Sequence, residues 1–124
     1  MKLIIGGMGQ GKLAYVLQVS GLAETDVART LSPKPIVYGL HQIIRDLLAQ
    51  GKDPAEVLDF AAAHPETVFI CDEVGSGVVP VQPEEREWRE AVGRVCCELA
   101  RRSDTVIRVF CGLPMTLKGE EQWN

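Results

Sequence analysis

Seven residues near the start of the chain, Gly6-Gly7-Met8-Gly9-Gln10-Gly11-Lys12, have the spacing of a phosphate-binding loop. They follow the apolar run Leu3-Ile4-Ile5, where a first strand should end. Glycines let the backbone curve around an anion so that several N–H groups point inward. The next helix turns its positive end toward the phosphates, and Lys12 supplies a charge for their outer oxygens. The spacing therefore predicts nucleotide binding by residues Gly6 to Leu13, with Lys12 as a catalytic residue.

Leu13 occupies the position at which such loops carry a Ser or Thr, whose hydroxyl binds Mg²⁺. Leucine has no oxygen to offer, so we expect any Mg²⁺ to be bound weakly or indirectly. Gly-rich turns also begin dinucleotide-binding folds, but the G-x-G-x-x-G pattern is not completed here. A purely structural turn would not need Lys12 at the positive end of a helix.

Two carboxylates, Asp72 and Glu73, follow a second apolar run that ends at Cys71. Side chains at the carboxyl ends of parallel strands face the crevice where such sheets bind ligands. We predict that Asp72 and Glu73 bind Mg²⁺, directly or through water, and that Glu73 is a general base. A helix cap or a salt bridge in a loop is the alternative for this pair.

Strands and helices that alternate along the chain must position these residues. Apolar runs predict strands at residues 2–6, 36–38, 67–71 and 105–111, and helical periodicity predicts helices at 11–20, 40–51, 53–64 and 84–102. We expect loops at residues 21–35 and 75–83 and a loosely ordered tail at 112–124. The pattern predicts an α/β, P-loop NTPase-like fold in one domain, residues 1–124, with a small, mostly parallel sheet flanked by helices.

Charge, hydropathy and cysteine spacing exclude several classes of partner and ligand. The 124 residues carry a net charge of −4, so we expect no nucleic-acid partner. No apolar run approaches the about 20 residues of a membrane span, so we expect no membrane partner, and the first apolar run is too short for a signal peptide. The cysteines have no zinc-ligand spacing, and we interpret all four as reduced: Cys71 and Cys111 inside strands, and Cys96 and Cys97 poorly placed to bridge each other. Reduced cysteines predict a cytoplasmic protein.

Two further stretches, EVGSGVVP at residues 73–80 and CGLPMTLKG at residues 111–119, follow the loop in order. Together with the loop, they resemble the adenosylcobinamide kinase/adenosylcobinamide-phosphate guanylyltransferase family of cobalamin biosynthesis. That family carries G-G-x-x-S-G-K-S, N-E-V-G-x-G-I-V-P and G-L-P-x-x-L-K elements. The resemblance implies a P-loop α/β fold, binding of GTP or ATP, a cobinamide as second substrate, and a homo-oligomer.

The chain also departs from that family. Gln10 and Leu13 replace the two loop serines, and Asp72 stands where the family has Asn. The family histidine that becomes guanylylated belongs to a segment that residues 21–35 replace here without a histidine. His41 follows the predicted strand at 36–38, and it is either a substitute nucleophile or a hydrogen-bonding residue at a helix start.

Three functions follow from these expectations. The first is a kinase or nucleotidyltransferase that uses GTP or ATP to transfer a phosphoryl group to a cobinamide. The second is a non-catalytic member of the same family that binds a nucleotide or a partner. The third is a small P-loop kinase with another substrate. In none of them do we expect a covalent guanylyl–histidine intermediate.

Overall fold

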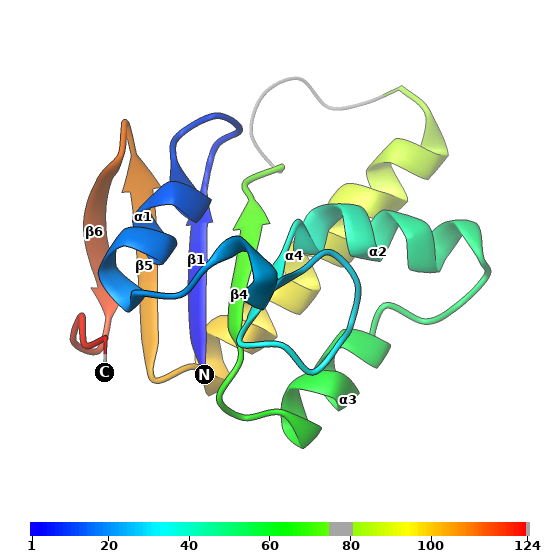
Figure 1. Ribbon diagram of the computed structural model, residues 1–124. Helices are drawn as coiled ribbons and strands as arrows, with labels where there is room; N and C mark the ends of the chain where they lie inside the picture. The colour runs from blue at the N-terminus through cyan, green and yellow to red at the C-terminus, as the bar shows by residue number, and fades with distance from the viewer. Residues whose placement is uncertain (75–80, 124) are drawn as a thin grey trace.

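A six-stranded sheet forms the centre of the protein, in the order β2-β3-β4-β1-β5-β6. The computed structural model describes residues 1–74 and 81–123 (Figure 1). Strands β1 to β5 pair in parallel, and β6 pairs antiparallel to β5. The strands are β1 (Lys2–Gly6), β2 (Val27–Ala28), β3 (Ile36–Tyr38), β4 (Val68–Asp72), β5 (Thr105–Phe110) and β6 (Leu113–Lys118). The helices are α1 (Lys12–Ser20), α2 (Leu40–Ala49), α3 (Glu56–Ala63) and α4 (Pro83–Arg102), with a 3-10 turn, η1 (Glu24–Asp26).

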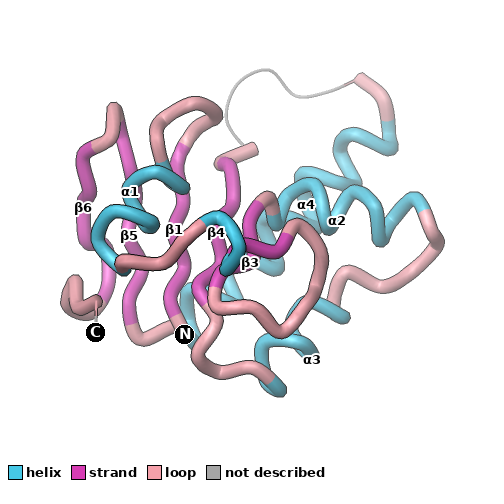
Figure 2. The backbone as a smooth tube through the Cα atoms, viewed as in Figure 1, coloured by secondary structure: helices cyan, strands magenta, loops and turns pink. Residues whose placement is uncertain are grey.

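Helices cover both faces of this sheet, as Figures 1 and 2 show. Successive residues of β1 point to opposite faces, so Leu3 packs with α2, α3 and α4, whereas Ile4 packs with α1. Strand β4 does the same with Phe69 and Ile70, which are fully buried on the two faces. A continuous apolar run is what a strand covered on both sides requires. The sheet therefore has the predicted α/β, mostly parallel form.

Helix α4 is the longest element and agrees with its prediction. Pro83 opens it, Glu84 and Glu85 lie in its first turn, and Arg101 and Arg102 lie in its last. Proline is suited to a first helical turn, and both charge pairs complement the helix dipole. Its buried side chains recur at helical spacing: Ala91, Val92, Val95 and Leu99.

Two loop predictions were wrong. Residues 21–35 contain η1 and the short strand β2, which pairs with β3 through Val27 and Ala28. The predicted tail contains β6, which pairs with β5 along its length. Pro114 lacks an N–H group, but an edge strand tolerates this loss. Beyond β6, Trp123 packs edge-on against Tyr15 of α1, whose hydroxyl bonds to Glu121.

Two smaller predictions also needed correction. Cys111 is not in a strand: with Gly112 it forms the two-residue turn between β5 and β6, and both residues have positive φ, 52° and 75°. Such a pair matches the type I′ turn that suits the twist of a hairpin. Helix α3 begins at Glu56 rather than at Asp53, whose carboxylate instead accepts the N–H of Ala55 at 2.9 Å.

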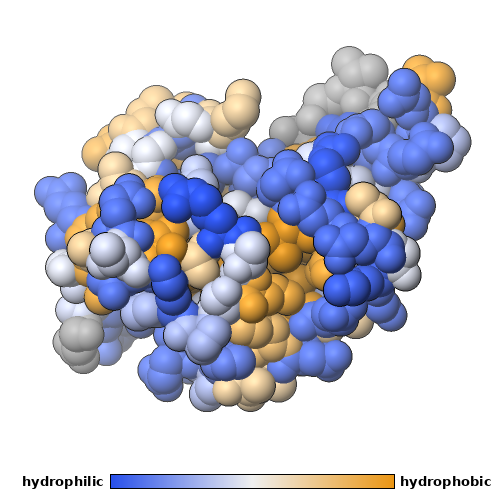
Figure 3. Space-filling view, turned by 45° about the vertical axis from the view of Figure 1, so that its right-hand side comes forward, coloured by the Kyte–Doolittle hydropathy of each residue, from blue (hydrophilic) through white to orange (hydrophobic). Residues whose placement is uncertain are grey.

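The surface is mixed in character. On the face drawn in Figure 3, hydrophilic residues predominate along the right-hand side and hydrophobic residues reach the surface near the centre. Within the described residues, no helix combines the length and the apolar character that crossing a membrane requires.

Candidate nucleotide site

The predicted loop joins the carboxyl end of β1 to the first turn of α1. Gly9 and Gly11 have φ angles of 73° and 87°, values that residues with a side chain seldom adopt. Gly11 is the N-cap of α1 and has no side chain with which to cap the N–H groups of that helix end. These groups are the donors that a bound anion accepts from. The glycine spacing and the helix that follows thus lie as the sequence predicted.

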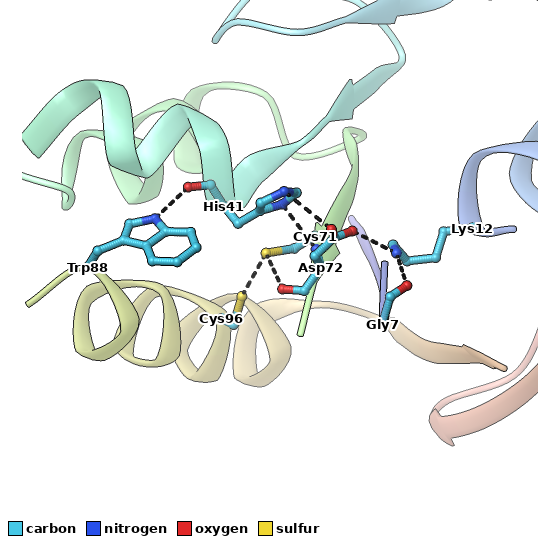
Figure 4. Close-up of polar contacts among 7 residues, drawn as sticks. All are labelled: Gly7, Lys12, His41, Cys71, Asp72, Trp88 and Cys96. Carbon is cyan, nitrogen blue, oxygen red and sulfur yellow. Dashed lines mark hydrogen bonds and ion pairs between the residues drawn. The ribbon is translucent and has the colours of Figure 1, made fainter. Parts of the chain in front are cut away.

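Lys12 lies folded into this loop and is only 5% exposed. Its ammonium group donates to the carbonyl of Gly7 at 2.7 Å and pairs with Oδ1 of Asp72, also at 2.7 Å (Figure 4). Burying an ammonium is costly unless it is paired and hydrogen-bonded, and these two oxygens meet that need. The two residues predicted from separate motifs, Lys12 and Asp72, are therefore in direct contact.

Asp72 ends β4 and stands in register with Gly6 of β1, where the loop begins. Its second carboxylate oxygen lies 3.4 Å from Nε2 of His41, and its backbone N–H donates to Nδ1 of His41 at 3.2 Å. Burial lowers the pKa of His41, against the opposing effect of the Asp72 charge. Since Nδ1 accepts a hydrogen bond, we place the proton of the neutral ring on Nε2, toward Asp72.

Glu73 lies next to this group but has a different partner. Its two carboxylate oxygens accept from Nε and Nη2 of Arg108 at 2.8 and 3.1 Å. This forked geometry is the strong form of an ion pair between Arg and a carboxylate. The sequence left a salt bridge open as the alternative for Glu73, and such a pair is present. Its role as a general base stays a prediction.

Gln10 ties the loop to the turn between β5 and β6. Its side-chain oxygen accepts the N–H of Cys111 at 2.7 Å, and its backbone carbonyl accepts the N–H of Gly112 at 2.8 Å. Gly11 also lies close to Gly112, because a Cβ added to Gly11 would come within 3.5 Å of the Gly112 Cα. This contact was missed in the sequence, where residues 112–124 were predicted as a loose tail.

The residues present fit Mg²⁺ poorly. Leu13 is half-buried and packs with the apolar residues around α1, and it has no oxygen. Asp72 is engaged by Lys12 and His41, and Glu73 by Arg108. Among residues 1–74 and 81–123, no group of three or more His, Cys, Asp or Glu side chains could hold a metal ion. Binding of Mg²⁺ by Asp72 and Glu73 stays a prediction that would require these pairs to open.

A pocket of about 390 Å³ adjoins the two carboxylates, between the sheet and α4. Its lining includes Ile5, Asp72, Glu73, Cys96 and Cys97. The pocket therefore lies beside the two predicted carboxylates, and no residue of the loop at 6–12 lines it. Of the predicted motif at residues 73–80, Glu73 and Val74 are in this region, and residues 75–80 lie outside the described part of the chain.

In a comparison with family models, the family described as cobinamide kinase / cobinamide phosphate guanyltransferase matches residues 41–117, more than half of the chain. The matched range begins at His41 and includes Asp72, Glu73 and Arg108. The loop at residues 6–12 precedes it, so the assignment of a phosphate site depends on the glycine spacing and the contacts of Lys12. A search of curated proteins gave no match.

Proposed function

This chain belongs to the cobinamide kinase/cobinamide phosphate guanyltransferase family, and we propose that it binds GTP or ATP at residues Gly6–Leu13 and transfers a phosphoryl group to a cobinamide. The family connects the chain to cobalamin biosynthesis and to transferase chemistry in general. The observation that carries the proposal is the placement of Lys12, a buried cation inside a glycine-rich loop at the N-terminus of a helix.

The contacts of Lys12 suggest how a triphosphate would be held. In the free protein, the ammonium group is balanced by Asp72 and by one loop carbonyl. A bound phosphate offers a doubly charged partner that can also accept hydrogen bonds from the loop N–H groups. We therefore propose that Lys12 turns from the Gly7 carbonyl to the phosphate when nucleotide binds, while Asp72 keeps its ammonium group in place.

The second substrate would approach from the side of the carboxylates. A hydroxyl that attacks a phosphoryl group must give up its proton. Among the residues that the structure describes, the carboxylates of Asp72 and Glu73 line the pocket and could receive this proton. Glu73 remains our candidate general base, and Arg108 would keep its oxygens oriented.

A second candidate function is supported by a specific observation. Leu13 supplies no metal ligand, and both carboxylates are already paired, so a non-catalytic member that binds a nucleotide or a partner is the alternative. The two functions differ in one measurement. Phosphorylated cobinamide should appear on incubation with GTP or ATP and Mg²⁺ if the first is correct, whereas nucleotide binding without turnover supports the second.

Calorimetric titration with GTP and with ATP tests the nucleotide site. Lys12→Ala should weaken binding more than tenfold, because it removes a charge-assisted contact worth about 1.5–3 kcal/mol. Lys34→Ala, at an exposed lysine far along the chain from the loop, is the matched control and should bind like the unaltered protein. Equal affinity of Lys12→Ala and Lys34→Ala would remove the phosphate site from consideration.

A further inference from the structure

Two thiols lie directly behind the candidate site. Cys71 precedes Asp72 on β4 and is fully buried, and Cys96 faces it from α4. Their Sγ atoms are 3.6 Å apart (Figure 4). All four cysteines are free. Neither the motifs nor the family match gives this pair a role.

One of the two cysteines is partly exposed. Cys96 is half-buried and lines the pocket of about 390 Å³ beside Asp72 and Glu73, whereas Cys71 belongs to β4 and is buried in the core. The neighbouring Cys71 thiol lowers the pKa of Cys96, because it can donate a hydrogen bond to the thiolate. Cys96 is therefore the sulfur that meets an oxidant, and Cys71 is placed to react second.

We propose that Cys71 and Cys96 form a reversible intramolecular disulfide, and that this bond lowers the affinity of the adjacent site for nucleotide. The first half depends only on the two thiols. The second half rests on the proposed function, since it requires nucleotide to bind at Lys12.

We assign a peroxide as the oxidant, and the reaction is written for hydrogen peroxide. The Cys96 thiolate attacks one peroxide oxygen, so that an S–O bond forms and the O–O bond breaks. The hydroxide that leaves takes up the proton that the Cys96 thiol has lost and becomes the first water. The Cys71 sulfur then attacks the Cys96 sulfur, so that the S–S bond forms, the S–O bond breaks and water leaves with the Cys71 proton. Two thiols are oxidised by two electrons, and one peroxide is reduced to two waters. A dithiol reductant reverses the bond by exchange.

We expect closure of the disulfide to shift the end of β4 or the facing turn of α4. The two sulfurs have to approach from 3.6 Å to about 2 Å. Asp72 is the next residue, with its N–H held by His41 and its carboxylate by Lys12. A displacement of Cys71 would therefore also displace the Asp72 carboxylate, which pairs with Lys12. Small displacements of a binding group weaken binding.

Peptide mapping of the full chain tests the bond itself. Reduced protein is treated with a slight excess of hydrogen peroxide, alkylated and digested without reductant. We expect a Cys71–Cys96 linked peptide that dithiothreitol removes. Cys111→Ser and Cys97→Ser should keep this peptide, and Cys96→Ser should lose it. A link through Cys97 or Cys111, or oxidation of Cys96 without any link, would overturn the proposal.

Nucleotide titration tests the consequence. Oxidised protein should bind at least fivefold more weakly than reduced protein, and dithiothreitol should restore the affinity. Cys96→Ser should bind nucleotide equally well before and after peroxide. A disulfide that forms without changing the affinity would refute the second half alone. If neither the reduced nor the oxidised protein binds nucleotide, the proposed function and the second half fail together, while the mapping result for the bond still stands.

Discussion

At the scale of single residues, Gln10 gains a structural role at a position where the resemblance implies a serine. A serine side chain is too short to span to the turn between β5 and β6, whereas the Gln10 oxygen accepts the N–H of Cys111 at 2.7 Å. The free N–H of a tight turn is thereby satisfied, and the loop is anchored to a neighbouring strand pair. The residue that departs from the family pattern thus fixes the position of the loop.

Leu13 gives the first prediction at this scale. Leu13→Ser should increase the gain in triphosphate affinity that Mg²⁺ produces over EDTA, because the hydroxyl adds an oxygen ligand next to Lys12. The measurement is calorimetric titration in both buffers. In the double variant Leu13→Ser/Asp72→Ala the gain should vanish if both side chains act on one ion.

An unchanged effect of Mg²⁺ in Leu13→Ser would mean that the loop does not hold a metal-bound triphosphate in the usual pose. The non-catalytic function would then be the better supported one.

His41 gives the second prediction. Both of its ring nitrogens face Asp72, one toward the backbone N–H and one toward the carboxylate. The Nδ1 lone pair accepts a hydrogen bond and Nε2 carries the proton, so we expect no covalent guanylyl–histidine after incubation with labelled GTP and denaturation. Acid-labile label on His41, found by peptide mapping, would contradict this and restore a two-step transfer.

The sequence predicted some of these neighbours and not others. The loop spacing and the acid after a buried strand placed Lys12 and Asp72 at one ligand site, because both motifs sit at the carboxyl end of a parallel sheet, but they did not predict the direct contact between the two side chains. The pair between Glu73 and Arg108 depends on which strand lies beside which and in what register, and local patterns do not contain that information.

At the scale of elements, β1 and β5 approach closely where the loop begins. A Cβ added to Gly6 would lie 2.4 Å from the carbonyl oxygen of Val109, closer than atoms can pack. A glycine is therefore required at this position by its neighbour, independently of any bound anion.

This contact gives the third prediction. Gly6→Ala should lower the free energy of unfolding by about 3 kcal/mol, since backbone atoms of two central strands must separate. Gly9→Ala is the matched control: it has a positive φ of 73° but nothing within 4 Å, so only about 1 kcal/mol of backbone strain is expected. Urea denaturation measures both. Equal losses in the two variants would refute the importance of the Val109 contact.

Elements with strong periodicity were predicted well, and short edge strands were not. Strand β4 is a buried apolar run, and α4 repeats its apolar residues over many turns. Strand β2 has two residues, too few for any period to be visible. Strand β6 is exposed along its whole length and contains Pro114, so its pairing with β5 determines its conformation.

At the scale of the whole molecule, β6 leaves one edge of the sheet open. Four of the large exposed hydrophobic side chains lie on the β5–β6 hairpin: Phe110, Leu113, Met115 and Leu117. An open edge with apolar side chains is a template for pairing with another chain. We therefore expect the chain to associate with copies of itself through this hairpin.

Light scattering or analytical ultracentrifugation checks this fourth prediction. The mass should exceed the 13.6 kDa of one chain, and Leu113→Lys should shift it toward one chain, because a charge at the edge opposes pairing. Val81→Lys, at another highly exposed apolar residue, should leave the mass unchanged. A monomer at all concentrations, or an equal effect of both variants, would exclude the hairpin as the interface.

The central position of β1 also decides when the chain can fold. Lys2 pairs with Val68 on one side and with Thr105 on the other, so β1 completes its pairing only with strands that lie far downstream of it in the sequence. Such distant pairings form slowly, because the chain loses the entropy of loop closure before any stabilising contact is made. The glycine-rich loop follows β1 directly and is hydrogen-bonded to the turn after β5. We therefore expect the loop to take its final shape only after the β5–β6 hairpin has formed.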